Sequence, residues 1–218
     1  MALKEKQTSG NYLSIIGGTL RKTVPEGTQG AIRREYETSD NKKGVKFELE
    51  YGSLEGNVVA VRFHESDYGK QVSIGIKDGQ TYYVQMPLKS RFAIDLMKKL
   101  PNVDIAQKIE LKPFDFEDDD GKTVKGISIL QNGEKVKNFF YNETTKKQDL
   151  HDFPQPDNGG QDFDSDDWQA YFNGVAKFLQ NYITLNIVSK LEKLDPNDEV
   201  QREEEYPTDE INPEDIPF

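Results

Sequence analysis

Over most of the first 130 residues, apolar and polar side chains alternate with a period of two, the pattern of a β-strand with one buried face. The clearest example is 45–51, where every second residue is apolar and the residues between are charged. The first apolar stretch, 12–23, contains Gly17-Gly18, which predicts a sharp bend within one long strand. Further strands are predicted at 31–38, 58–64, 71–77, 81–86, 108–116 and 122–130, and 133–141 is an additional candidate.

Two segments have a helical period instead. In 89–100 the apolar residues form one buried side, and Pro101 ends the helix. In 165–194 an apolar stripe beginning at Trp168 predicts a helix of roughly 40 Å, with Ser165 as its N-cap. Such a face must be covered, either by the strands or by a second protomer, so we expect a monomer or a homodimer.

The order of these elements predicts a mainly β fold with helices, of the α+β class. Several strands, one helix and a closing hairpin is the order of an OB-fold, a small antiparallel barrel, and an SH3-like or other small barrel is the alternative. The chain then divides into a flexible arm at 1–10, an OB-fold-like domain at 11–141, a linker at 142–164, a long amphipathic helix at 165–194 and a disordered acidic tail at 195–218.

The formal net charge of −11 is distributed unevenly along the chain. Residues 1–147 carry 24 Lys and Arg against 21 Asp and Glu, a net charge of +3, whereas residues 148–218 carry 4 against 18, a net charge of −14. A basic body with an acidic tail is the pattern expected of a nucleic-acid-binding protein. A mildly basic domain with a solubilising tail gives the same charges, so the charge alone leaves both interpretations open.

The acidic tail finishes in Asp215, Ile216, Pro217 and Phe218. An acidic segment with this tip resembles the C-terminus of bacterial single-stranded DNA-binding proteins and of some bacteriophage counterparts. The resemblance covers those four residues and the acidic character before them. No motif of the body aligns with the bacterial family, and the long helix before the tail departs from that family, which favours the bacteriophage type.

The resemblance implies a non-catalytic OB-fold protein that coats single-stranded DNA in replication, recombination and repair, in the cytoplasm of a bacterial host. It also implies that the tip, Asp215 to Phe218, recruits partner proteins. The alternative is an adaptor or scaffold of the replication machinery that carries the same tail and has no DNA affinity of its own. Because residues 195–218 contain ten acids and one arginine, the tail is also a candidate to occupy the DNA groove when DNA is absent.

The sequence gives no support for catalysis. It has no cysteine, and its two histidines, His64 and His151, lie in neither a zinc motif nor a triad-like context. The acidic clusters at 117–120 and 162–167 lack the spaced ligands of a calcium loop, although a metal-dependent nuclease using them is a third hypothesis. We therefore expect no enzyme, no cofactor and no metal. No apolar run is long enough to span a membrane, and no signal-type start is evident.

Sequence-independent binding of single strands requires cations along the phosphates and aromatic faces on which bases stack. Alternation places basic and aromatic side chains on the outward faces of neighbouring strands, and the loops add more. The predicted DNA contacts are Arg33, Arg34, Tyr36, Lys42, Lys43, Lys46, Arg62, His64, Tyr68, Lys70, Lys77 and Tyr83. The strand and helix periodicities assign five other aromatic residues to the core: Phe47, Tyr51, Phe63, Tyr82 and Phe92.

Overall fold

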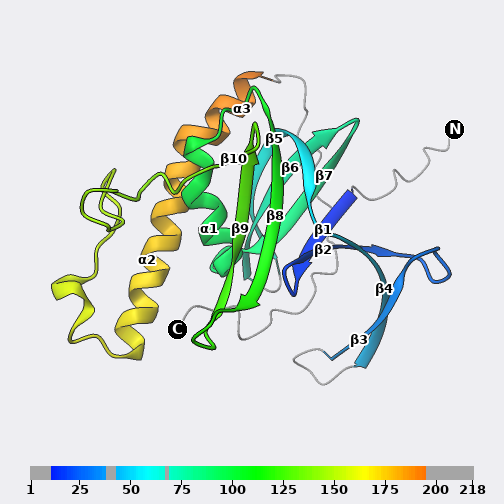
Figure 1. Cartoon of the computed structure of the whole chain (residues 1–218), viewed down its shortest axis with the longest axis horizontal. Helices are drawn as coiled ribbons and strands as arrows, with labels where there is room; N and C mark the ends of the chain where they lie inside the picture. Colours follow the sequence, from blue (N-terminus) through cyan, green and yellow to red (C-terminus); the bar gives the residue numbers. More distant parts are fainter. Residues whose placement is uncertain (1–10, 38–42, 67–68, 195–218) are drawn as a thin grey trace, which may run out of the picture.

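The structure is a computed structural model that describes residues 11–37, 43–66 and 69–194 (Figure 1). The predicted arm at 1–10 and tail at 195–218 lie outside these residues. The strands are β1 (Asn11–Ile16), β2 (Thr19–Val24), β3 (Ile32–Glu37), β4 (Lys43–Tyr51), β5 (Leu54–Ser66), β6 (Gly69–Asp78), β7 (Gln80–Pro87), β8 (Lys108–Glu117), β9 (Thr123–Gln131) and β10 (Glu134–Lys135). The helices are α1 (Arg91–Lys99), α2 (Ser165–Ile183) and α3 (Ser189–Leu194), with 3₁₀ turns η1 (Leu100–Asn102) and η2 (Asp157–Gly160) and a π-helical turn η3 (Thr184–Val188).

All ten strands belong to one open sheet, in the order β10-β9-β8-β5-β6-β7-β1-β2-β4-β3. Every pairing is antiparallel except that of β1 with β7, which is parallel. The prediction of a mainly β fold with a helix between strands and a long helix near the end is confirmed. The prediction of a closed barrel is wrong, because β10 and β3 are the two edges of the sheet and do not pair.

Side chains of α1 explain why β9 does not pair with a further strand over most of its length. The Asp95 carboxylate accepts the Ile127 N–H at 2.7 Å, and the Lys99 amine donates to the Ile127 carbonyl at 2.6 Å. One turn earlier, the Arg91 guanidinium donates to the Thr123 carbonyl at 3.1 Å. A strand edge is a template for further pairing unless its backbone groups are covered, and here a helix covers them.

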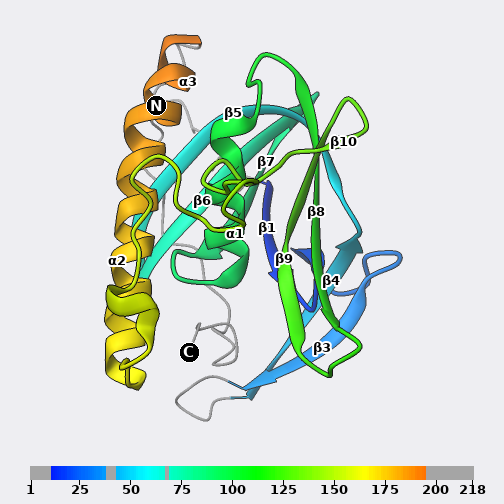
Figure 2. The ribbon, with the colours of Figure 1, turned by 60° about the vertical axis from the view of Figure 1, so that its left-hand side comes forward.

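The main core lies between one face of the sheet and the helices. It joins Val72, Ile74 and Ile76 of β6 to the buried side of α1, whose N-cap Ser90 accepts the Ala93 N–H at 3.2 Å. The predicted helix at 89–100 is therefore confirmed. In Figures 1 and 2, α2 and α3 run along the outside of α1, and Leu179 and Ile183 of α2 are completely buried.

The glycine pair does not bend one long strand, as the sequence suggested; it separates β1 from β2. Gly17 and Gly18 have φ values of 56° and 72°, and two consecutive positive φ angles form the tight turn of a hairpin. The turn lies against β8: a β-carbon on Gly18 would stand 2.5 Å from the backbone nitrogen of Asp115. Glycine is thus required at position 18 for both conformation and close approach.

Strands β3 and β4 form a ribbon that extends away from the rest of the sheet (Figures 1 and 2). Because little packs on the ribbon, Tyr51, which was expected in the core, is 42% exposed, and Phe47 is only half-buried. Of the other aromatic residues expected in the core, Phe92 is buried, while Phe63 and Tyr82 are partly buried and pack against the core.

The predicted helix at 165–194 runs unbroken through α2, η3 and α3. Its N-cap is Asp164 rather than Ser165: the Asp164 carboxylate accepts the N–H groups of Asp166 and Asp167. At the π turn, side chains of Thr184, Asn186 and Ser189 donate to backbone carbonyls four residues earlier, which satisfies acceptors that the wider turn displaces.

The segment between β9 and α2 has little regular structure. Only Glu134–Lys135 of the candidate strand 133–141 is extended and paired, and it forms β10. Residues 142–164 contain η2 and a series of turns, yet Phe153 lies in the core with Phe140, their ring centroids 5.1 Å apart. No helix of the described residues has the length and apolar composition needed to cross a bilayer.

Candidate nucleic-acid interface

The face of the sheet that turns away from the helices, here called the outer face, carries seven of the predicted contacts. Register fixes this assignment, because paired residues point to the same side of a sheet and successive residues alternate. Arg62, Ser73 and Gln85 lie side by side across β5, β6 and β7, as do Gly75 and Tyr83. The predicted contacts on the outer face are Arg34, Tyr36, Lys46, Arg62, His64, Lys77 and Tyr83.

An aromatic platform lies at the centre of this face, where β7 meets β1. The rings of Tyr83 and Tyr12 stack with centroids 5.5 Å apart, and the Arg62 guanidinium lies 4.8 Å from the Tyr83 centroid. The ring of Tyr83 rests over Gly75, where a β-carbon would come within 3.0 Å of it. We call Tyr12, Tyr83, Arg62 and Gly75 the Tyr83 platform.

Polar groups border the Tyr83 platform. His64 Nε2 and Gln85 Nε2 lie 2.7 Å apart, which fits an amide donating to a neutral imidazole nitrogen. The Ser73 side chain is 1% exposed, and its hydroxyl has no hydrogen-bond partner among the described residues. Buried hydroxyls are normally paired, so Ser73 retains unused hydrogen-bonding capacity beside the platform.

The same arrangement of ring, glycine and cation recurs on the β3–β4 ribbon. The Tyr36 ring crosses Gly44, where a β-carbon would stand 2.4 Å from Tyr36 Cζ, and Lys46 Nζ lies 4.7 Å from the ring centroid. Tyr36, Gly44 and Lys46 form the Tyr36 platform. Register across β1, β2, β4 and β3 keeps both platforms on the outer face, separated by four interstrand spacings, which is roughly 19 Å measured across the strands.

Between the two platforms lies a buried ion network rather than free cations. The Arg34 guanidinium donates to both oxygens of Glu48, at 2.9 and 3.0 Å, and Arg21 donates to Glu48 at 3.1 Å and lies 2.6 Å from Glu50. Burial alone raises the pKa of Glu48, but the hydrogen bonds and charges of Arg34 and Arg21 outweigh it and hold that pKa below its ordinary value. The charges of the two arginines and two glutamates cancel within the network. Arg34 therefore holds the ribbon together through Glu48.

Three predicted contacts point away from the outer face. Arg33 and Lys43 alternate with outer-face residues of the ribbon and are near Glu35 at 2.7 Å and Glu37 at 3.8 Å. Lys70 alternates with Gln71 at the start of β6 and is exposed on the other side. Lys42 and Tyr68, together with the tip residues Asp215, Ile216, Pro217 and Phe218, lie outside the described residues.

Comparisons of the chain with known protein families, with curated proteins and with solved structures found no match. The physical arrangement of the outer face is therefore the basis on which a function can be argued. Within the described residues, no group of three or more His, Asp or Glu side chains is placed to hold a metal ion.

Sequence reasoning missed several residues of this face, among them Tyr12, Ser73 and Gln85. Tyr12 was assigned to a long bent strand. Its stacking on Tyr83 depends on the parallel pairing of β1 with β7, which no local sequence pattern predicts. Ser73 and Gln85 alternate outward on β6 and β7, and this alternation was the signal that could have found them.

Proposed function

We propose that this protein binds single-stranded DNA non-catalytically and largely without sequence preference through the outer face of the sheet. The observation that carries the proposal is the pair of platforms, each with a tyrosine ring packed close to a glycine and with one cation over the ring. A base stacks on such a ring whatever its identity, because every base has a π-face. The cation that covered the ring then lies beside the strand, where it can pair with a phosphate.

The order of strand pairing favours an opened OB-like core. Strands β5, β6 and β7, helix α1 and strands β8 and β9 follow the OB order, and β5 pairs with both β6 and β8, with a bulge at Val58/Ala60. In OB-folds the face of the second and third strands binds oligonucleotides. The corresponding strands here are β6 and β7, which carry Ser73, Gly75 and Tyr83. In this proposal β1 occupies the edge of β7 that the last strand takes in a closed barrel.

The proposal also includes a role for the tail. Residues 195–218 carry ten acids and one arginine, and the tip Asp215 to Phe218 is proposed to recruit replication, recombination and repair proteins. If the tail competes with DNA, removal of 195–218 will tighten binding to a labelled oligo-dT. An unchanged affinity would refute that competition and leave the recruitment role to be tested by peptide pull-down.

The direct test is a fluorescence anisotropy titration of labelled oligo-dT with the full chain. Tyr83→Ala and Tyr36→Ala should each weaken binding by about 1–3 kcal/mol, the value of one stacked base. Tyr83→Phe keeps the ring and should bind within about twofold of the wild type. The matched control is Tyr141→Ala, which removes an exposed tyrosine of the β9–α2 segment and should have no effect.

Salt provides the second criterion, because displacement of counterions from phosphates makes affinity fall as salt rises. Absence of salt-sensitive binding at micromolar protein would refute the proposed function and favour an adaptor that acts through the tail alone. Equal loss of affinity in Tyr83→Ala and Tyr141→Ala would refute the assignment to the outer face.

A further inference from the structure

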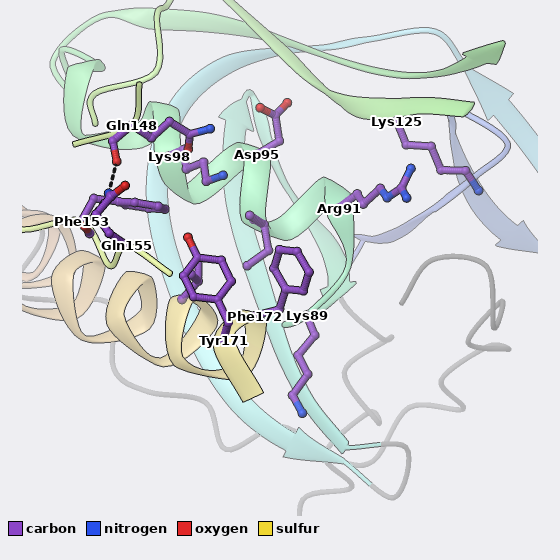
Figure 3. A pocket seen from close by; sticks show the side chains of 12 residues that line it. Lys89, Arg91, Asp95, Lys98, Lys125, Gln148, Phe153, Gln155, Tyr171 and Phe172 are labelled. Atoms are coloured by element: carbon purple, nitrogen blue, oxygen red, sulfur yellow. Dashed lines mark hydrogen bonds between the residues drawn. The ribbon is translucent and has the colours of Figure 1, made fainter. Parts of the chain in front are cut away.

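A cavity of about 430 Å³ lies on the helical side of the sheet, away from the outer face. It is open to solvent on one side and is lined by α1, by the first half of α2, by residues 148–155 and by the edge of β9 (Figure 3). Its volume lies within the range of about 300–1,000 Å³ that is usual for small-molecule sites.

The cavity has an excess of positive charge. Lys89, Arg91, Lys98 and Lys125 line it, against one acid, Asp95. That acid is already engaged by Lys99 and by the Ile127 N–H, and Lys125 lies 3.4 Å from Asp115. Within the described part of the chain, neither Lys89 nor Lys98 forms an ion pair within 4.0 Å, although the charge of Asp95 acts on Lys98. Their amines can therefore still approach an anion.

Lys98 of α1 is partly buried in the wall of the cavity. Its amine lies 5.2 Å from the centroid of the Phe153 ring. Burial lowers the pKa of Lys98, while the charge of Asp95 acts in the opposite direction. A buried amine without an ion-pair partner gains stability when an anion binds beside it, because the anion compensates the lost hydration.

Aromatic rings and one unused acceptor complete the site. The rings of Tyr171 and Phe172 face the α1 side chains across the cavity (Figure 3), and the Tyr171 hydroxyl is held by the Pro154 carbonyl at 3.1 Å. The side-chain oxygen of Gln148 is buried and has no hydrogen-bond partner among the described residues. It can accept a hydrogen bond from an N–H group of a ligand. Such a bond is strongly favoured because the buried oxygen is otherwise unpaired.

We propose that this cavity binds a nucleoside phosphate, with its base against Tyr171 and Phe153 and an N–H of the base on Gln148, and with its phosphate toward Lys98, Arg91 and Lys89. Arg91 and Lys98 are seven residues apart, so they lie on one face of α1 and about 10 Å apart along its axis. A planar base against the aromatic rings and a phosphate beside the cations of α1 match this lining. The ligand is either a free nucleotide or the phosphorylated end of a strand.

The only tryptophan of the chain, Trp168, reports on the site, since its ring stacks on Phe172 with centroids 5.8 Å apart. Titration of the full chain with deoxyadenosine monophosphate should change its fluorescence saturably. Deoxyadenosine alone and inorganic phosphate alone should each bind about tenfold or more weakly, because each lacks one half of the contacts.

Lys98→Met and Lys89→Met keep the length of the side chain and remove its charge. Lys98→Met should weaken binding of the monophosphate about tenfold to a hundredfold, and Lys89→Met should weaken it less because Lys89 is exposed. The control is Lys177→Met, an exposed position of α2 outside the cavity, which should leave binding unchanged. Circular dichroism of each variant verifies that the fold is retained.

Oligonucleotides with and without a 5′ phosphate separate the two sources. Preference for the phosphorylated strand assigns the cavity to a strand end, and equal binding with a retained monophosphate signal assigns it to a free nucleotide. Failure of the monophosphate to bind both the full chain and a variant lacking 195–218 would overturn the inference. Binding of a peptide of residues 203–218 in its place, lost in Lys98→Met, would identify an acidic peptide site instead.

This inference does not depend on the proposed DNA-binding face. Tyr83→Ala should leave monophosphate binding unchanged, and Lys98→Met should leave the stacking contribution of Tyr83 unchanged. Failure of one proposal is therefore distinguishable from failure of the other.

Discussion

Replacement of Glu48 by Gln tests how the β3–β4 ribbon is held. Glu48 of β4 is 1% exposed and accepts from Arg34 of β3 and Arg21 of β2, so it joins the ribbon to the rest of the sheet. Gln has nearly the same size and can still accept one hydrogen bond, but it leaves two guanidinium groups without their common counter-charge.

The structure sets the magnitude. Three hydrogen bonds to a charged group, at about 1.5–3 kcal/mol each, give an upper limit of about 9 kcal/mol. The arginine side chains are 17% and 18% exposed, and Arg21 keeps Glu50, so water and the second glutamate recover much of this. Removal of one partner of a buried ion pair typically costs about 3–5 kcal/mol. We expect Glu48→Gln to lower the free energy of unfolding by about 3 kcal/mol.

Urea unfolding followed by circular dichroism measures this difference. The matched control is Glu35→Gln on the same ribbon, whose partner Arg33 is 54% exposed and which is itself 73% exposed; its cost should be below about 1 kcal/mol. An equal loss of unfolding free energy in the two variants would refute this reasoning, because burial of the ion pair would then have no effect on its contribution.

The pH dependence gives an independent check. Since the folded-state pKa of Glu48 lies below the ordinary value of 4.5, its contribution to stability is present above 4.5 and is lost as the pH falls through the folded-state pKa. The difference between the wild type and Glu48→Gln should therefore be constant near neutral pH and shrink below pH 4.5. A difference that grows on acidification would contradict the assigned direction.

Four further substitutions are predicted from local packing. Gly126→Ala would place a β-carbon 2.5 Å from the Asp95 carboxylate that caps β9, and should cost about 1–3 kcal/mol by thermal or urea unfolding. Gly174→Ala, in open space on the exposed side of α2, should raise stability by about 0.5–1 kcal/mol, and a loss would show an unrecognised contact. Leu179→Ala should cost about 3 kcal/mol, whereas Leu185→Ala, 73% exposed, should change stability by less than about 0.5 kcal/mol.

Strands and helices of this chain could be predicted because their signals are local. The alternation in 45–51, 71–77 and 81–86 located β4, β6 and β7. The prediction of a closed barrel was wrong because periodicity does not show which elements lie side by side. Arg91, Asp95 and Lys99 recur every four residues as a polar stripe on α1, and such a stripe is indistinguishable in sequence from a solvated face until β9 lies beside it.

The candidate site was predictable only as to which side of a strand a residue takes, and this failed for Arg33 and Lys70, which lie on the side opposite to the one expected. Alternation placed Arg34 outward, which is where it lies, but its engagement with Glu48 depends on the register of β3 with β4. The contact of Arg62 with Tyr83 likewise needs the pairing of β5 with β6 and of β6 with β7. Alternation places each platform residue on one side of its strand, whereas the register between strands brings these residues together.

The π turn has a consequence for how the long helix tolerates change. Its buried residues Val175, Leu179, Ile183, Ile187 and Leu191 are spaced by four, and four residues of an α-helix advance about 40° beyond a full turn. Over the four steps the stripe would drift by about 160°, and the single extra residue of the π turn takes back about 100° of it. Deletion of one residue within 184–188 should restore a regular helix and leave Leu191 facing the core, because the deleted residue is the one that the wider turn absorbs. The turn therefore acts as a phase correction, which lets the helix contain one additional residue while its buried stripe stays on the core.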